Sequence, residues 1–185
     1  MIITVFGSSK PLPNEEEYQT AYQLGRLIGE SGFSVCTGGY RGIMDAVSKG
    51  ASEFNVEVIG VTVDLFSAKP SQYLTKEIHC SSLFERIEKL IEIGDAYIIL
   101  RGGTGTLVEL SITWELINKK LSTRKPIACH GEMWGKIVST MEERIKFEKR
   151  ETGLVKCFDS VEECFGFIKS NRKAHREDTK VAKKK

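Results

Sequence analysis

The sequence has no apolar run that approaches the ~20 residues a helix needs to cross a bilayer. It begins MIITVFGSSK, in which no basic region precedes the apolar residues, so we expect a buried strand there and not a secretion signal. Its hydrophobic content of 41% and charged content of 28% are ordinary for a globular protein. These features exclude a membrane protein and predict no membrane partner.

Cysteine and histidine do not occur in the spacings of a metal site. The five cysteines are odd in number, no two form a CxxC pair, and only three histidines accompany them. We therefore predict neither a disulfide framework nor a zinc site, and a reducing, cytoplasmic environment. His79 and Cys80 end a predicted strand without a partner at ligand or triad spacing, and we interpret both as packing residues.

The formal charge of +2 is unevenly distributed. Residues 171–185 hold seven lysines and arginines against two acidic residues, which amounts to +5 and leaves −3 for the rest of the chain. A mildly acidic body is not typical of a protein that binds nucleic acid. We interpret the basic tail as a solvated, disordered end, and we do not expect a nucleic-acid partner.

Apolar segments typical of strands alternate with segments of helical period, which predicts an α/β fold. A single domain over residues 1–170 fits this length. The expected strands are 2–6, 34–37, 56–63, 77–80, 95–100, 125–130 and 154–158. Helices between successive strands imply parallel crossovers, hence a doubly wound, mainly parallel sheet of about seven strands with helices on both faces.

Three loops with small residues follow expected strands. They are GSS at 7–9, TGGYRG at 37–42 and RGGTGT at 101–106. Because ligands of open α/β sheets bind beyond the carboxyl ends of the strands, the fold should bring the three loops together. This convergence predicts a binding site at one edge of the sheet.

The stretch RGGTGTLVE, residues 101–109, has the chemistry of a phosphate-binding loop. Glycines let the backbone approach an anion closely, threonines add hydroxyl donors, and a helix N-terminus offers unpaired N–H groups with a favourable dipole. The stretch is neither a Walker loop nor the dinucleotide GxGxxG. We expect it to bind a phosphate, with Glu109 acting on the sugar beside it.

Local structure offers a second explanation of the same residues. Thr106 and Glu109 match a capping box, in which the glutamate only bonds back to the start of its own helix. Turn chemistry alone would explain the other two loops. Considered alone, Arg41 is explained equally well as a surface charge and as a ligand contact. Arg86, considered alone, is explained as an exposed arginine paired with Glu85 or Glu88.

The whole pattern resembles a known family. The run LFERIEKLIEIGDAYIILRGGTGTLVELSITWELI (83–117), with TGGYRGIMDAV upstream and FGSS near the start, resembles the "lonely guy" family over about residues 2–150. That family has the signature P-G-G-x-G-T-x-x-E after an M-x-x-R-K segment. The spacing from Arg86 to Gly102 agrees with it. Many members are cytokinin riboside 5′-monophosphate phosphoribohydrolases.

The resemblance implies a Rossmann-like nucleotide-binding domain, usually a homodimer, that uses no metal or other cofactor. It also implies hydrolysis of the N-glycosidic bond of a nucleoside 5′-monophosphate, a purine or N6-substituted adenosine type, to free base and ribose 5-phosphate. Arg86 and Glu109 would be the catalytic pair. The expected substrate- and phosphate-binding residues are Gly7, Ser8, Ser9, Gly38, Gly39, Arg41, Gly42, Gly102, Gly103, Thr104, Gly105, Thr106 and Thr113.

Several positions depart from the family pattern. Arg101 replaces the signature proline and would place a cation next to the phosphate loop, Ile87 replaces the lysine, and Val108 stands where many members have an acidic residue. The TGGYRG loop is about one residue shorter than usual, as in the related molybdenum-cofactor carrier proteins. The alternative function is therefore a nucleotide or molybdenum-cofactor carrier without turnover.

Overall fold

The computed structural model describes residues 1–65 and 68–171, so the basic tail predicted over 171–185 lies almost entirely outside the described residues. The strands are β1 Ile2–Phe6, β2 Ser34–Thr37, β3 Val58–Val63, β4 Lys76–Cys80, β5 Ala96–Ile99, β6 Ile127–His130 and β7 Val155–Phe158. The helices are α1 Glu16–Glu30, α2 Ile43–Ser52, α3 Leu83–Ile93, α4 Thr104–Asn118, α5 Glu132–Phe147 and α6 Val161–Ser170. Within the described ranges, no helix is both long and apolar enough to cross a membrane.

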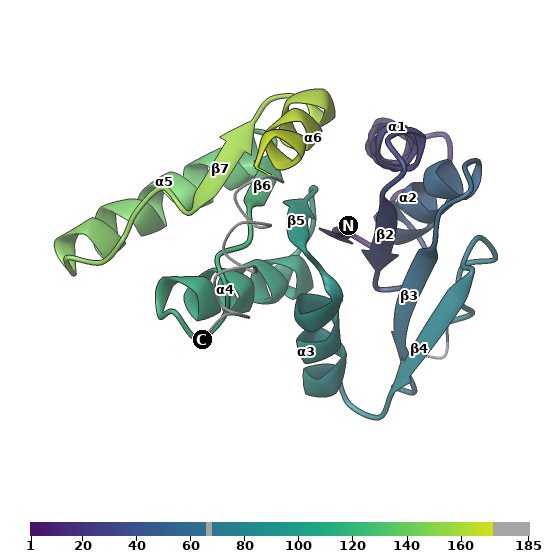
Figure 1. Cartoon of the computed structure of the whole chain (residues 1–185), viewed down its shortest axis with the longest axis horizontal. Helices are drawn as coiled ribbons and strands as arrows, with labels where there is room; N and C mark the ends of the chain where they lie inside the picture. The colour runs from purple at the N-terminus through teal and green to yellow at the C-terminus, as the bar shows by residue number, and fades with distance from the viewer. Residues whose placement is uncertain (66–67, 172–185) are drawn as a thin grey trace, which may run out of the picture.

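All seven strands of the described chain form one parallel sheet in the order β4-β3-β2-β1-β5-β6-β7 (Figure 1). The chain builds outward from β1 to β4 and then crosses back to place β5 on the other side of β1. The strand order therefore reverses between β1 and β5, and a ligand site is expected at their carboxyl ends. The predicted doubly wound, Rossmann-like α/β fold is confirmed.

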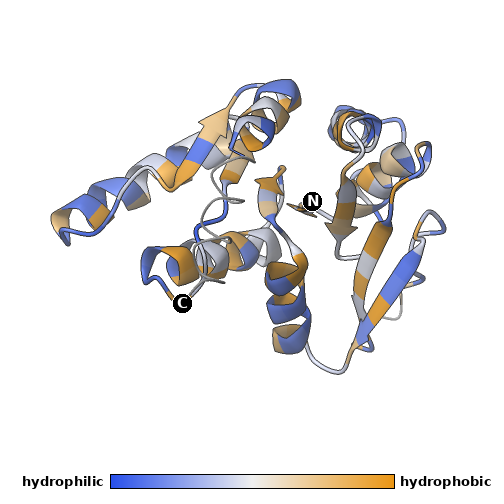
Figure 2. Ribbon diagram, viewed as in Figure 1, coloured by the Kyte–Doolittle hydropathy of each residue, from blue (hydrophilic) through white to orange (hydrophobic). Residues whose placement is uncertain are grey.

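Two apolar layers separate the sheet from its helices. The packing of α1, α2 and α6 encloses one cluster, and the residues of α3, α4 and α5 enclose the other on the opposite face (Figure 1). The central strands β3 and β5 are buried along their whole length and are mostly apolar, because both of their faces are covered (Figure 2). This double burial explains why the strands appear in the sequence as continuous apolar runs.

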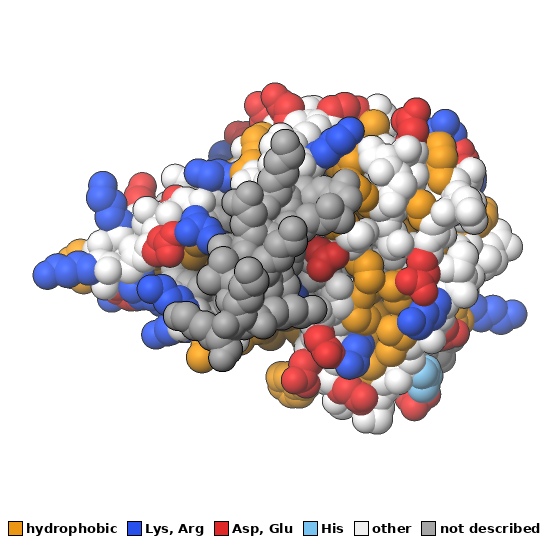
Figure 3. All heavy atoms as spheres, in the orientation of Figure 1, with side chains coloured by type: hydrophobic (Ala, Val, Ile, Leu, Met, Phe, Trp, Pro, Cys, Tyr) orange, Lys and Arg blue, Asp and Glu red, His pale blue; other side chains and the backbone are white. Residues whose placement is uncertain are grey.

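The edge strand β4 is more polar and more exposed than the central strands. It carries exposed polar residues, among them Lys76, Glu77 and His79, and is bluer than β3 in Figure 2. Apolar side chains remain visible between α3 and this edge in the space-filling view (Figure 3). Charged side chains on an edge strand oppose pairing with another chain. We therefore interpret the polar residues of β4 as protection of this sheet edge.

The first helix shows how local signals set the ends of the elements. Glycine at position 32 has φ +71°, the left-handed conformation that a side chain rarely adopts. Its N–H donates to the Gly29 carbonyl, and the Phe33 N–H reaches back to the Ile28 carbonyl. These two bonds are the Schellman pattern, so α1 ends where the sequence predicts. Element bounds elsewhere differ by only a few residues from those expected; β3, for example, begins at Val58 and not at 56.

Helices α1 and α2 pack closely because glycines line their contact. A Cβ placed on Gly25 would overlap the backbone of Val47, and one on Gly50 would overlap the Tyr22 carbonyl oxygen. Backbone atoms cannot move aside as a flexible side chain can. The start of the same helix, α2, contacts the loop after β1, because the Ile43 N–H donates to the Ser8 carbonyl.

We predict that Gly25→Ala and Gly50→Ala each lower the free energy of unfolding by about 2 kcal/mol or more, because overpacking outweighs the helix propensity gained by alanine. Gly166→Ala in α6 is the matched control, since a Cβ there meets open space. The control should leave stability unchanged or raise it. Denaturant titrations would measure all three, and a neutral Gly25→Ala variant would contradict the packing argument.

Candidate active site

The three loops that the sequence singled out meet at the carboxyl ends of β1, β2 and β5. The Ser8 N–H donates to the Arg101 carbonyl oxygen over 3.0 Å, and the Ser8 carbonyl accepts from the Ile43 N–H over 2.8 Å. Ser8 thus joins the loop after β5 to the start of α2. Gly42 has φ +68°, and a Cβ on it would overlap the backbone at Ser8, so this junction requires glycine. The predicted convergence is confirmed.

The loop after β5 ends in a cradle of main-chain N–H groups. Gly103 is the N-cap of α4, and Leu107 is the first residue whose N–H bonds back to it, over 3.0 Å. The N–H groups of the intervening first turn have no partner within the helix and point out of its N-terminus. A Cβ on Gly103 or Gly105 would meet open space, so these two glycines leave room for a ligand. An anion is favoured at this position.

The capping-box explanation of Thr106 and Glu109 is wrong. Helix α4 begins at Thr104, two residues before the proposed cap, and no side chain caps its N-terminus. Thr106 is the third helical residue, and its buried side chain packs against Gly102, where a Cβ would overlap its hydroxyl oxygen. Glu109 lies in the second turn, one turn too late for a capping role. Its side chain is therefore available for another purpose.

Arg86 is buried, so the interpretation as an exposed arginine is also wrong. Its side chain is 7% exposed although it lies near the start of α3. The guanidinium donates from Nε to the Val61 carbonyl over 2.8 Å and from Nη2 to the Gly38 carbonyl over 3.1 Å. A Cβ on Gly38 would overlap the guanidinium, which explains the glycine. These bonds hold the cation at the base of the three loops.

Glu109 faces Arg86 from the opposite wall. Its Oε1 lies 3.8 Å from Arg86 Nη1, and its side chain is 13% exposed. Burial raises the pKa of this carboxyl to about 7, and the arginine opposes the shift without cancelling it. At 3.8 Å the contact is an ion pair without a short hydrogen bond. The carboxyl group therefore changes its ionisation near neutral pH, a property typical of residues in functional sites.

The pair borders a cleft of about 590 Å³. Of the predicted residues, nine line it: Gly7, Ser8, Ser9, Arg86, Gly103, Thr104, Gly105, Thr106 and Glu109. Those outside its lining are Gly38, Gly39, Arg41, Gly42, Gly102 and Thr113. Thr113 donates its hydroxyl to the Glu109 carbonyl over 2.7 Å, and Arg41 is exposed.

Arg101 does not add a cation to the cradle, contrary to the sequence-based expectation. Its guanidinium is turned outward to Glu17, 3.1 Å away, and its side chain is 63% exposed. It borders a separate cavity of about 170 Å³ on the α1 side. The departure from the family's proline therefore leaves the charge of the cradle unchanged.

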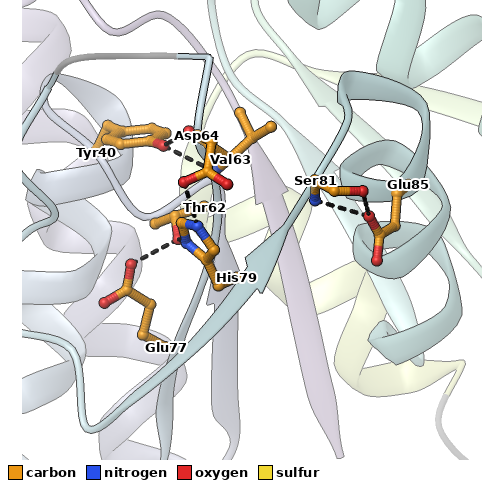
Figure 4. Close-up of polar contacts among 8 residues, drawn as sticks. All are labelled: Tyr40, Thr62, Val63, Asp64, Glu77, His79, Ser81 and Glu85. Atoms are coloured by element: carbon orange, nitrogen blue, oxygen red, sulfur yellow. Dashed lines mark hydrogen bonds and ion pairs between the residues drawn. The ribbon is translucent and has the colours of Figure 1, made fainter.

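Sequence reasoning missed five residues of the cleft: Lys10, Tyr40, Met44, Leu65 and Ala68. Tyr40 is the most informative. Its hydroxyl donates to the Val63 carbonyl and accepts from the Val63 N–H, both over 2.8 Å (Figure 4). Its ring centre lies 5.8 Å from the Arg86 guanidinium carbon. An aromatic residue between glycines was the available signal, but the sequence does not show which strand it would contact.

His79 is not a packing residue, because its side chain is 57% exposed. Its Nε2 lies 2.5 Å from an Asp64 carboxylate oxygen and its Nδ1 lies 3.2 Å from the Thr62 hydroxyl, which donates to Glu77 (Figure 4). Thr62 and His79 are neighbours in the register of β3 and β4. This polar chain fastens the edge strand beside the cleft. Cys80 is buried, as expected.

Ionisation of Glu109 should make stability depend on pH. Between its ordinary pKa of 4.5 and about 7 the unfolded chain releases a proton that the folded chain keeps, so folded-state stability falls as pH rises through this window. Relative to Glu109→Gln, the wild type should lose roughly 3 kcal/mol between pH 4 and pH 8.

Chemical denaturation across this pH range measures that loss. Glu115→Gln, on the same helix but exposed, is the control and should follow the wild type. If the free energy of unfolding of the wild type and of Glu109→Gln changed with pH in parallel, the Glu109 carboxyl group would not be buried in solution.

The family model for the SLOG cluster4 family matches residues 1–164. The chain belongs to this family. The resemblance predicted from the sequence is thereby confirmed, both to the "lonely guy" proteins and to the related carriers.

Three relatives of this SLOG cluster4 chain give the family context. It is 32% identical over 118 residues to a cytokinin riboside 5′-monophosphate phosphoribohydrolase of Rhodococcoides fascians, covering 60% of each chain. It is 33% identical over 106 residues to a pyrimidine/purine nucleotide 5′-monophosphate nucleosidase of Escherichia coli strain K12, covering 52% of this chain and 23% of that protein. The chain thus spans less than two thirds of the length of either.

The third is a solved structure, the molybdenum cofactor binding protein of the phototrophic bacterium Rippkaea orientalis. The two share 26% sequence identity and a TM-score of 0.71, over 91% of this chain and 95% of that one. The chain is thus similar in sequence to proteins named for hydrolysis and in structure to one named for binding.

Proposed function

We propose that the protein hydrolyses the N-glycosidic bond of a nucleoside 5′-monophosphate and releases the free base and ribose 5-phosphate. The observation that carries the proposal is the buried Arg86–Glu109 pair, set 3.8 Å apart beside an open main-chain cradle. The names of two relatives support the same reaction class. A purine nucleotide is the preferred substrate in this proposal; an N6-substituted adenosine monophosphate would place the reaction in cytokinin biosynthesis.

The substrate phosphate occupies the N-terminus of α4. Gly103 and Gly105 leave space there, and the Thr104 side chain on the same turn adds a hydroxyl donor. Lys10 lines the same cleft and supplies a positive charge at its rim. Each hydrogen bond to the charged phosphate contributes about 1.5–3 kcal/mol, so several bind a nucleotide by this end.

Glu109 then lies where the anomeric carbon is placed. Glu109 follows the first turn of α4 by about three residues, which is roughly 5 Å along the helix axis. This distance is similar to the length of a ribose ring with its 5′ carbon. Breaking the bond to the base develops positive charge on the sugar. The ionised carboxylate stabilises this charge and orients the attacking water.

Arg86 keeps the carboxylate in place and favours its ionised form. Its Nε and Nη2 donate to the Val61 and Gly38 carbonyls, and these two bonds hold the guanidinium in place. Because it also lines the cleft, it contacts the nucleotide on the side of the departing base. No metal is needed for these steps.

Incubation with AMP and with an N6-substituted AMP, followed by chromatography, should detect free base. Glu109→Gln should lower kcat by about 10²–10³, the usual effect of removing one well-placed electrostatic group. Glu115→Gln, the control on the exposed side of α4, should retain full activity. The wild-type rate should rise with pH through about 7 as Glu109 ionises. Absence of base release from every nucleoside monophosphate would overturn the proposal.

A second candidate is a carrier that binds a nucleotide or molybdenum cofactor without turnover. The observation in its favour is the fold and 26% identity shared with a molybdenum cofactor binding protein along nearly the whole of both chains. The same cradle would hold the phosphate of either ligand. A pterin that co-purifies, and whose binding survives Glu109→Gln, would favour this function over hydrolysis.

The cradle itself can be tested by filling it. Gly105→Ala places a methyl group in the open space at the second residue of α4. Binding of AMP measured by calorimetry should weaken at least about tenfold, since the methyl group displaces the phosphate, while stability stays equal or rises by up to about 1 kcal/mol. Gly166→Ala should alter neither property beyond that small stability gain. Unchanged AMP affinity would show that the phosphate does not bind at this site.

The homodimer implied by the family resemblance remains part of this proposal. Helix α4 presents Leu107 and Val108, 37% and 44% exposed, on its outer side next to the cleft. A second copy packed there would cover apolar surface beside the substrate.

A further inference from the structure

Two cysteines lie side by side in the sheet, on strands β6 and β7. Neither cysteine lines the cleft. Cys129 of β6 and Cys157 of β7 are partners in the parallel register, and both belong to the apolar cluster on the α5 side. Adjacent strands run about 4.8 Å apart, within the range of Cα separations that a disulfide spans. Both are free thiols.

The two side chains are cross-strand neighbours and differ in acidity. Interaction with the Cys129 side chain lowers the pKa of Cys157, against the opposing effects of burial and the Glu142 carboxylate. Interaction with Cys157 and deep burial raise the pKa of Cys129. Cys157 is therefore the thiol that ionises first, and a thiolate is the form that reacts with oxidants.

Access separates Cys157 from the other four cysteines. Cys36, Cys80, Cys129 and Cys164 are buried, whereas Cys157 is half-buried and lines an open groove of about 490 Å³ between β7 and α5. Ser139 and Glu142 of α5 share this groove, so small polar molecules can enter it. β7 is also the last strand of the sheet on this side, so Cys129 is its cross-strand neighbour in β6.

We propose that Cys157 and Cys129 form an oxidant-reactive pair, a modification site for hydrogen peroxide that is separate from the nucleotide cleft. The Cys157 thiolate attacks one peroxide oxygen, the O–O bond breaks, and the departing hydroxide takes up a proton to become water. Cys157 is then a sulfenic acid. The Cys129 sulfur attacks the Cys157 sulfur, the S–O bond breaks, and a second water leaves with the Cys129 proton. Two thiols are thus oxidised to one disulfide as one peroxide is reduced to two waters.

The experiment treats the folded protein with hydrogen peroxide, blocks remaining thiols with N-ethylmaleimide and locates disulfides by peptide mass spectrometry. A Cys129–Cys157 crosslink should appear, and Cys157 should react at least about tenfold faster than any other cysteine. Circular dichroism during the treatment confirms that the fold is retained.

Three variants separate the roles. Cys157→Ser should abolish the crosslink. Cys129→Ser should leave a Cys157 sulfenic acid that dimedone traps, because the resolving thiol is gone. Cys164→Ser is the control, because the Cys164 thiol contacts the Cys129 carbonyl from the other face of the sheet, and it should form the crosslink normally. Equal oxidation of all five cysteines, or conversion of wild-type Cys157 to sulfinic acid with Cys129 still free, would overturn the proposal.

Discussion

The cleft depends on one buried cation. Removing a guanidinium from water costs several kcal/mol unless its hydrogen bonds and charge are compensated. Arg86 meets this requirement with two backbone carbonyls, the face of Tyr40 and the carboxyl group of Glu109. The absence of a side chain at Gly38 and the position of Glu109 on α4 follow from the same need. Residues far apart in sequence are thereby constrained together.

The balance between charge attraction and burial sets the chemistry of the site. An arginine 3.8 Å away would ordinarily hold a carboxylate ionised, yet burial raises the pKa of Glu109 to about 7. Burial prevails because the arginine shares its hydrogen bonds with the backbone and gives Glu109 only a longer-range attraction. A carboxyl group in this state is sensitive to the charge that develops on a bound ligand. The burial of this pair thus gives the site a carboxyl group that changes its ionisation near neutral pH.

The site is compatible with both proposed functions. In either, the cradle at the start of α4 would bind a phosphate irrespective of what is attached to it, because its donors are main-chain N–H groups. Only the hydrolase proposal assigns chemistry to the carboxyl group beside it. Arg101, the most conspicuous departure from the family signature, is turned to Glu17 and leaves the cradle as it was.

The sequence alone predicted about seven strands, a mainly parallel sheet and the meeting of three loops with small residues, whereas the strand order came from the structure. Apolar runs mark doubly buried strands, glycines mark turns and close approaches, and the crossover rule leaves few ways to connect them. Tertiary structure alone decided that Arg86 is buried, that Glu109 lies beyond the first turn and that Tyr40 reaches Val63. Helical spacing places Arg86 near the start of α3 but does not reveal that two carbonyls from other strands surround it. Burial, ion pairing and pKa arise from residues distant in the chain, and so they become visible only when the fold brings those residues together.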